Sequence, residues 1–173
     1  HLEEAYIAAK AENDPRSQVE ALGHLATLYY ALALNVKAEN AFTEALELAR
    51  SIGYRRGEGN NLVNLAGFHL LLGRGGRALG LFAQADEVFA ALGDGRGQAF
   101  VRLNGAELAL WILGDDEGAR LQAEQAAVYF RSVGDTRREA ACLVTMAGVD
   151  RRAGRRRLAR RRALTHAAGP DVV

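Results

Sequence analysis

The sequence has little cysteine and proline and no long apolar run. Its single cysteine, Cys142, allows no internal disulfide and suits a reducing compartment, so we expect a cytoplasmic protein. Only two of the 173 residues are proline, which favours uninterrupted helices. Apolar stretches such as Leu108–Leu113 are far too short to cross a bilayer, and no basic-then-apolar secretory leader opens the chain. We therefore expect neither a secreted disulfide scaffold nor a membrane partner.

The spacings that catalytic and metal sites need are also missing. The chain has four histidines: His1, His24, His69 and His166. None of them lies near another histidine or near Cys142 at a metal-ligand spacing, and His69 and Cys142 are predicted to be core residues. The glycine-rich segments 73–76 and 93–97 lack the Lys-Ser/Thr pair of a phosphate loop and follow no strand. We expect no enzymatic activity, no metal and no cofactor.

What the sequence does contain is a repeat of about 40 residues. Small residues recur at intervals of 40 or 41 in three series: Ala26, Ala66, Ala106 and Ala147; Ala45, Ala85 and Ala126; Gly53, Gly93 and Gly134. Apolar residues at i, i+3, i+4 and i+7, as in segment 22–29, predict helices between these glycines. A repeat of this period predicts an all-α solenoid of stacked helix pairs, an architecture that serves binding.

The expected helices form three complete pairs with a partial pair at each end, all in one domain of residues 1–173. The pairs are about 16–34 with 37–53, 57–72 with 75–92, and 97–113 with 116–133. The repeats that contain them are 16–55, 56–94 and 95–135, between a partial repeat at 1–14 and a truncated one at 136–169. Because the pattern starts in mid-helix, we expect a fragment of a longer protein.

The turns within the pairs raise two further points. Gly73, Gly114 and Gly154 are each expected to end the first helix of a pair. The third pair carries one extra residue. Either its first helix is longer, which keeps Ala106 in register with Ala66, or segment 93–97 absorbs the residue. We favour the longer helix, because the alternative puts a glutamate where a small residue belongs.

These residues resemble the tetratricopeptide (TPR) repeat. The matching positions are Leu65-Ala66, Gly73, Ala78, Phe82 and Ala85, and again Leu25-Ala26, Tyr29, Ala38, Phe42 and Ala45, with Ala33 in place of the glycine. Nearly the whole chain is similar to the 40-residue variant found in large bacterial transcriptional and signalling regulators and in cell-polarity adaptors. Departures from the pattern are His69, Gly105 and Asp150.

The resemblance implies a right-handed α-α superhelix that acts as a protein-interaction or scaffold module. It implies a protein or peptide partner, or an effector domain of the same protein. The alternative is a ligand-sensing regulatory domain of a transcriptional activator. A homodimer through apolar ends of the solenoid also stays open. Separately, the sequence does not decide whether Trp111 is buried or exposed.

In such a solenoid the first helices of the pairs line a groove. The residues expected there are His24, Asn60, Asn64, Asn104, Glu107 and Thr145. Because an asparagine side chain both donates and accepts hydrogen bonds, a ladder of asparagines can hold the main chain of an extended peptide. The alternative is a solvated groove without a dedicated ligand. Asparagine replaces the lysine and arginine of carboxylate-binding family members, so we do not expect capture of a C-terminal carboxylate.

Charge is distributed very unevenly along the chain. Residues 1–150 carry 14 Lys+Arg and 20 Asp+Glu, whereas residues 151–162 carry eight arginines and no acid. The arginines are Arg151, Arg152, Arg155, Arg156, Arg157, Arg160, Arg161 and Arg162. Three interpretations stay open: a solvated helix face, contact with an acidic protein surface, or contact with nucleic acid. No interleaved aromatic residues accompany the run, which makes nucleic acid the weakest of the three.

Overall fold

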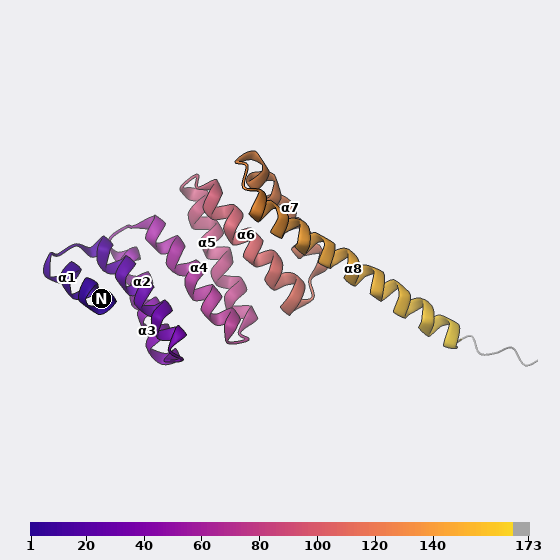
Figure 1. Cartoon of the computed structure of the whole chain (residues 1–173), viewed down its shortest axis with the longest axis horizontal. Helices are drawn as coiled ribbons and strands as arrows, with labels where there is room; N and C mark the ends of the chain where they lie inside the picture. Colours follow the sequence, from indigo (N-terminus) through magenta and orange to yellow (C-terminus); the bar gives the residue numbers. More distant parts are fainter. Residues whose placement is uncertain (168–173) are drawn as a thin grey trace, which may run out of the picture.

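Helices joined by short turns make up the computed structural model, which describes residues 1–167 and the side chains of residues 1–157 apart from Glu3 and Ala5 (Figure 1). The elements are α1 (Leu2–Ala11), α2 (Pro15–Ala31), α3 (Asn35–Ser51), α4 (Arg55–Leu71), α5 (Gly75–Ala91), α6 (Gly95–Leu108), the π-helical turn η1 (Ala109–Leu113), α7 (Asp116–Ser132) and α8 (Thr136–Ala167). Within residues 1–167 no strand occurs. The expected all-α class is therefore confirmed.

The helices stack in pairs along one direction (Figure 1). Each helix packs against the next in the chain, and the first helices of successive pairs, α2, α4, α6 and α8, also contact one another in order. The first helices therefore share one face of the stack, and the second helices α3, α5 and α7 lie behind it. This arrangement places side chains from several repeats on a common surface.

A residue in the left-handed conformation follows the end of each helix before α8. Gly73 has φ +72°, and the N–H of Arg74 donates to the His69 carbonyl at 2.9 Å, which closes the end of α4. Ala33 takes the same conformation at φ +58° after α2, although alanine lacks the freedom of glycine. The hydrogen bond from Leu34 N–H to the Tyr29 carbonyl, at 2.8 Å, closes that turn in the same way.

The recurring alanines lie in the buried contacts between helices. Ala26, Ala66 and Ala106 on the first helices are fully buried, and so are Ala45 and Ala85 on the second helices. Phe42 and Phe82 fill the space beside them. Ala147 on α8 is exposed, because no helix in the described part of the chain covers that face of α8.

The extra residue of the third pair is absorbed inside its first helix. The N–H of Asp115 donates at 2.9 Å to the carbonyl of Ala109, six residues earlier, whereas Arg74 bonds five residues back. The wide turn is η1, and Ala106 stays buried in register with Ala66. The register that keeps alanine in place is therefore confirmed. In η1 the side chain of Trp111 is 58% exposed, which answers the question that the sequence left open.

The expected break at Gly154 is wrong. Gly154 is not among the residues with positive φ, and α8 continues through it to Ala167. Gly73 and Gly114 each precede a second helix with an apolar face, whereas Gly154 precedes three arginines. Six of the eight residues after Gly154 are arginines, which makes it costly for that segment to pack back against α8, and Leu143 and Val144 of α8 are exposed.

Candidate functional site

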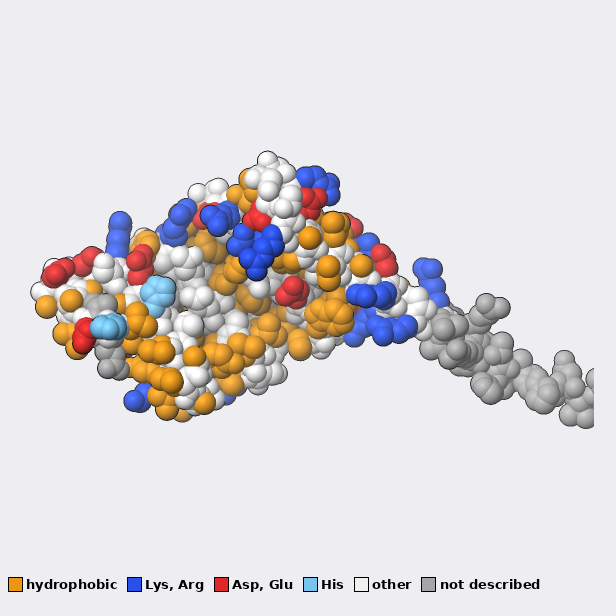
Figure 2. Space-filling model, in the orientation of Figure 1, with side chains coloured by type: hydrophobic (Ala, Val, Ile, Leu, Met, Phe, Trp, Pro, Cys, Tyr) orange, Lys and Arg blue, Asp and Glu red, His pale blue; other side chains and the backbone are white. Residues whose placement is uncertain are grey.

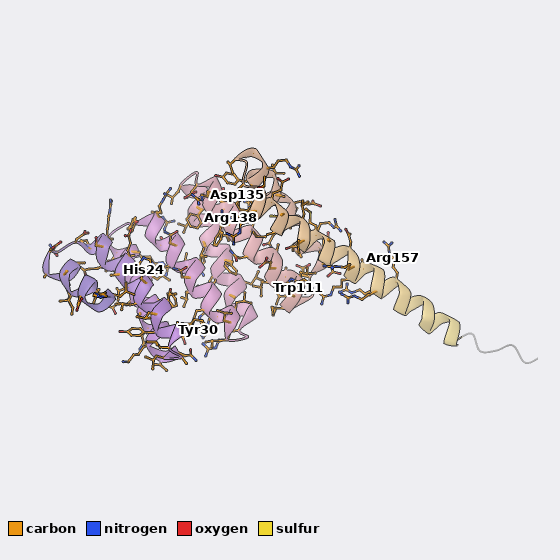
Figure 3. The ribbon with its side chains drawn as sticks, in the orientation of Figure 1. His24, Tyr30, Trp111, Asp135, Arg138 and Arg157 are labelled. Carbon is orange, nitrogen blue, oxygen red and sulfur yellow. The ribbon has the colours of Figure 1, made fainter. Side chains whose placement is uncertain are left out.

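Two adjoining hollows form a groove across the first helices. One has a volume of about 500 Å³ and the other about 280 Å³, and they share Val63, Asn64 and Phe100. We call the larger one the polar hollow and the smaller one the apolar hollow. Figure 2 shows this face of the stack, with the pale blue side chain of His24, labelled in Figure 3, on its left-hand part.

The polar hollow exists because glycines and an aromatic ring meet at its floor. Phe89 of α5 lies between α4 and α6, where a Cβ placed on Gly97 would be 2.5 Å from its ring and one placed on Gly59 would be 2.8 Å away. Contacts that short require one partner to shift. Glycine at the start of α6 therefore lets Phe89 pack there, and Phe89 and Gly97 both line the hollow.

Three arginines surround the polar hollow: Arg56, Arg96 and Arg138. Arg56 pairs with Asp94 at 3.0 Å. Arg138 lies over the Phe100 ring at 6.0 Å and pairs with Asp135, which Figure 3 places beside it. Hydrogen bonds from Arg138, together with the more distant charge of Arg96, lower the pKa of Asp135.

Arg96 is the least engaged of these arginines. Among the described residues it forms no ion pair within 4 Å, and its side chain is exposed. The opposite wall holds the carboxylate of Glu20, which accepts a hydrogen bond from the Tyr54 hydroxyl at 3.0 Å. The polar hollow therefore combines a free guanidinium on one side with a hydrogen-bonded carboxylate on the other.

The apolar hollow lies toward the far ends of the same helices. It is lined mainly by Tyr30, Phe42, Phe68, Leu70, Leu71 and Phe82, with Asn64 and Asn104 at its polar margin. Tyr30 and Phe68 pack edge to face, with their ring centroids 5.7 Å apart. This end of the groove can take an apolar side chain.

Four of the predicted groove residues do line the groove. His24 and Asn60 line the polar hollow, Asn104 lines the apolar hollow, and Asn64 borders both. Asn104 donates from Nδ2 to the Phe100 carbonyl at 2.8 Å, which leaves its side-chain oxygen available. Glu107 lines neither hollow, and partial desolvation raises the pKa of its carboxyl.

The placement of Thr145 in the groove is wrong. Its side chain is 2% exposed, and its hydroxyl donates to the Ala141 carbonyl at 3.1 Å. Three residues further along α8, a Cβ on Gly148 would lie 2.7 Å from Leu110 Cδ2 of η1, so this side of α8 packs closely against the preceding pair. This contact buries the side of α8 that carries Thr145 and Gly148, whereas the equivalent side of the earlier first helices is open.

One lining residue that the sequence did not single out is Asn61. It is buried, and its Nδ2 donates to the Gly57 carbonyl at 2.9 Å. Its Oδ1 faces Gly23 of α2 and has no hydrogen-bond partner among the described residues. The sequence signal for a buried asparagine was the pair Asn60-Asn61 directly before the core residue Leu62. A polar residue within an apolar stripe is, however, easily taken to be a solvent-exposed one.

The arginine run divides into paired and unpaired residues. Arg152 and Arg156 pair with Asp116 at 3.4 Å and 3.0 Å, and Arg152 also donates to the Leu110 carbonyl in η1. Arg151, Arg155 and Arg157 are exposed and form no ion pair within 4 Å among the described side chains. Arg160, Arg161 and Arg162 lie in α8, but their side chains are outside the described set.

His69 and Cys142 are buried, as predicted. Burial lowers the pKa of His69 despite Glu39 Oε1, which lies 4.0 Å from its Nε2. Burial raises the pKa of the Cys142 thiol to about 11, which makes it a poor nucleophile. Within the described residues there is no group of His, Cys, Asp and Glu that could hold a metal ion. Nor does this part of the chain contain a helix with the length and apolar character needed to cross a bilayer.

Comparison with known proteins supports the fold. No family model matches the chain, and no curated protein matches its sequence. The solved structure of BtubC (BKLC) from P. vanneervenii is similar, with a TM-score of 0.65 and 20% sequence identity. The similarity covers 99% of this chain and 74% of that one. At this identity the likeness concerns the fold alone.

Proposed function

We propose that this chain is a TPR-type protein-interaction module, a right-handed superhelix whose groove binds an extended segment of a partner protein. The 40-residue interval, the alanine contacts and the stacking of first helices on one face support this proposal. The partner belongs to another protein or to an effector domain of a larger cytoplasmic regulator. The mechanism is binding, with no bond made or broken.

The chemistry of the two hollows defines the segment that fits. Asn60, Asn64 and Asn104 are placed to hydrogen-bond a peptide main chain. Arg96 and Arg138 offer guanidinium groups to an acidic side chain. The apolar hollow accepts a large apolar side chain further along the segment. The proposed ligand is therefore an extended peptide with an acidic side chain followed or preceded by an apolar one.

The observation that carries this proposal is that both hollows share Asn64 and Phe100, so one continuous ligand can occupy them together. The test is selection of a phage-displayed library of random linear peptides on the wild-type chain. Enriched sequences should combine acidic and apolar residues, and their affinity should fall at least about tenfold in Asn64→Ala/Asn104→Ala, the loss of one to two hydrogen bonds.

Two variants sharpen this test. Arg96→Glu should shift the selected sequences toward basic residues, because it reverses the charge on one wall of the polar hollow. Glu124→Ala, an exposed change on α7 behind the groove, should leave affinity unchanged. Selected peptides that bind all of these variants equally would refute the groove as the binding surface.

A second candidate function is the sensing of a small molecule. The polar hollow, at about 500 Å³, is within the size range of small-ligand sites, and its lining mixes aromatic rings with arginines and amides. In this case a metabolite collection screened by thermal shift should yield a compound whose stabilisation disappears in Arg96→Glu. An absence of such compounds, together with enriched peptides, would leave the peptide-binding function.

A further inference from the structure

A row of exposed apolar side chains follows the turns within the helix pairs. We call this surface the turn edge, and its members are Leu32, Leu34, Val36, Leu71, Trp111, Ile112 and Leu113. They come from the α2–α3 turn and the start of α3, from the end of α4 and from η1, which lie along the lower edge of the stack in Figure 1. Figure 2 shows orange side chains along much of that edge. A group of exposed apolar side chains on one edge is a feature of interaction sites.

Arginines outnumber acids beside the turn edge, although the exposed acids Asp115 and Glu117 follow η1 directly. Each of two acidic side chains there is held by a pair of arginines. Glu39 pairs with Arg74 at 3.2 Å and Arg77 at 3.6 Å. Asp116 pairs in the same way with two arginines of α8. Around Glu39 the two arginines leave a net positive charge. Near η1 the three acids of residues 115–117 are outnumbered only when all five arginines of residues 151–157 are counted.

The basic helix and the apolar turn form one continuous surface. The Arg152 guanidinium donates to the Leu110 carbonyl in η1 and lies 3.4 Å from Asp116 at the start of α7. The ring of Trp111 packs near Gly148 of α8, where a Cβ would be 3.5 Å from the indole. In Figure 2 the orange patch at this end of the edge adjoins blue side chains of α8, and Figure 3 labels Trp111 and Arg157 there.

We propose that the turn edge docks on an anionic membrane surface, as a peripheral contact that spans nothing. Tryptophan, leucine and isoleucine side chains on a row of turns suit the headgroup boundary, where amphipathic aromatic rings are favoured. Arginines beside them are attracted to anionic headgroups. This goes beyond the groove, which lies on the face of the first helices, and it departs from the expectation that the chain has no membrane partner.

Trp111 makes the test direct, because it is the only tryptophan in the sequence. The whole chain is mixed with vesicles of phosphatidylcholine, with and without phosphatidylserine, and followed by co-sedimentation and by Trp111 emission. The expected result is binding to the anionic vesicles only, with a blue shift of the emission. Ile112→Ser should weaken binding about tenfold, the effect of one large apolar side chain withdrawn from an apolar phase.

The matched control is Val128→Ser on α7, since Val128 is 68% exposed but lies away from the turn edge. This variant should bind as the wild type does. Arg155→Glu/Arg157→Glu should weaken binding to anionic vesicles and leave the secondary structure unchanged.

Three results would overturn the proposal. One is an absence of vesicle binding, and another is binding without a blue shift, which would assign the contact to the arginines alone. The third is an acidic amphipathic peptide that shifts Trp111 emission while both kinds of vesicle fail. That result would indicate that the turn edge binds a protein partner and not a membrane.

Discussion

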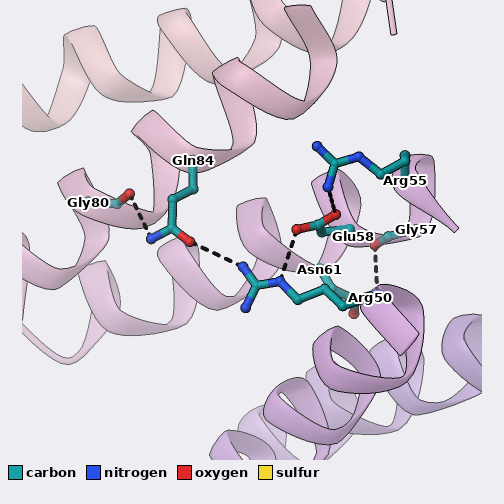
Figure 4. A network of polar contacts seen from close by, with 7 residues as sticks. All are labelled: Arg50, Arg55, Gly57, Glu58, Asn61, Gly80 and Gln84. Atoms are coloured by element: carbon teal, nitrogen blue, oxygen red, sulfur yellow. Dashed lines mark hydrogen bonds and ion pairs between the residues drawn. The ribbon is translucent and has the colours of Figure 1, made fainter. Parts of the chain in front are cut away.

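Glu58 is a buried carboxylate whose partners can be removed one at a time. Its side chain is 6% exposed and accepts hydrogen bonds from Arg50 Nε, at 2.9 Å, and from Arg55 (Figure 4). Arg50 also donates to Gln84 on α5 at 3.2 Å. The carboxylate therefore joins α3 to α4, and through Arg50 the contact extends to α5.

The exposure of each partner sets the expected magnitudes. The side chains of Arg50 and Arg55 are 46% and 49% exposed, so either one can be hydrated when Glu58 is lost. Glu58→Ala should lower the free energy of unfolding by about 1–2 kcal/mol. Arg50→Ala or Arg55→Ala alone should cost about 1 kcal/mol, since the other arginine still pairs with the carboxylate. The double variant leaves a buried charge unpaired and should cost about 3–5 kcal/mol, more than the sum.

Urea denaturation followed by circular dichroism measures these differences. Adding Glu58→Ala to the double arginine variant should recover stability, because the triple variant no longer buries an unpaired charge. Arg131→Ala is the internal control. Arg131 binds Glu139 at 2.7 Å in the equivalent positions of α7 and α8, but this pair is more exposed and should contribute at most about 1 kcal/mol. An additive double variant, or a triple variant no more stable than the double, would refute the reasoning.

Two further predictions concern packing and titration. Gly97→Ala should destabilise the fold by about 1–3 kcal/mol in the same urea assay, because the added Cβ would meet the Phe89 ring. Gly80→Ala, whose Cβ would have nothing within 4 Å, should stabilise the fold by up to about 1 kcal/mol. Equal effects of the two substitutions would disprove the close approach of Gly97 to Phe89. Cys142 should resist a thiol reagent at pH 8 until the chain unfolds, since burial raises its pKa from 9.0 to about 11. The thiol loses its proton at a lower pH in the unfolded chain than in the folded one. The contribution of the buried thiol to stability is therefore complete below pH 9 and falls as the pH rises toward 11. A Cys142→Ala variant should lack that part of the pH dependence.

Much of the fold follows from the sequence because glycines and alanines mark its geometry. The observed bounds of α3, α4, α5 and α7 lie within two residues of the expected ones. The reason is that a left-handed residue lies in the turn before and in the turn after each of these helices. Gly154 carried the same signal and produced no turn. A glycine permits the left-handed conformation, but only a second helix that packs back makes the turn favourable. After Gly154 six of the next eight residues are arginines, whose burial against α8 would be costly.

The groove was predictable in part. The asparagine stripe follows from helical spacing, and Asn64 and Asn104 lie where that spacing puts them. Arg96 and Arg138 did not belong to the stripe, because they stand near the starts of α6 and α8 and reach the polar hollow from its rim. Thr145 has the same spacing in the repeat as Asn64 and Asn104, but its side chain is buried. Thr145 is buried because α8 packs against the preceding pair on that side, and the spacing of residues within one helix does not show how closely a neighbouring helix packs.

The π-helical turn links the groove to the turn edge. An extra residue in segment 93–97 would have shifted the start of α6 and disturbed the contact between Gly97 and Phe89 that shapes the polar hollow. Absorbed at 109–113, it leaves that contact intact and changes only the far end of the helix. There it turns Trp111 outward and offers the Leu110 carbonyl to Arg152. Insertions of this kind cluster at functional positions in helices. The third pair therefore contributes to both surfaces because its helix widened at one end and kept its register at the other.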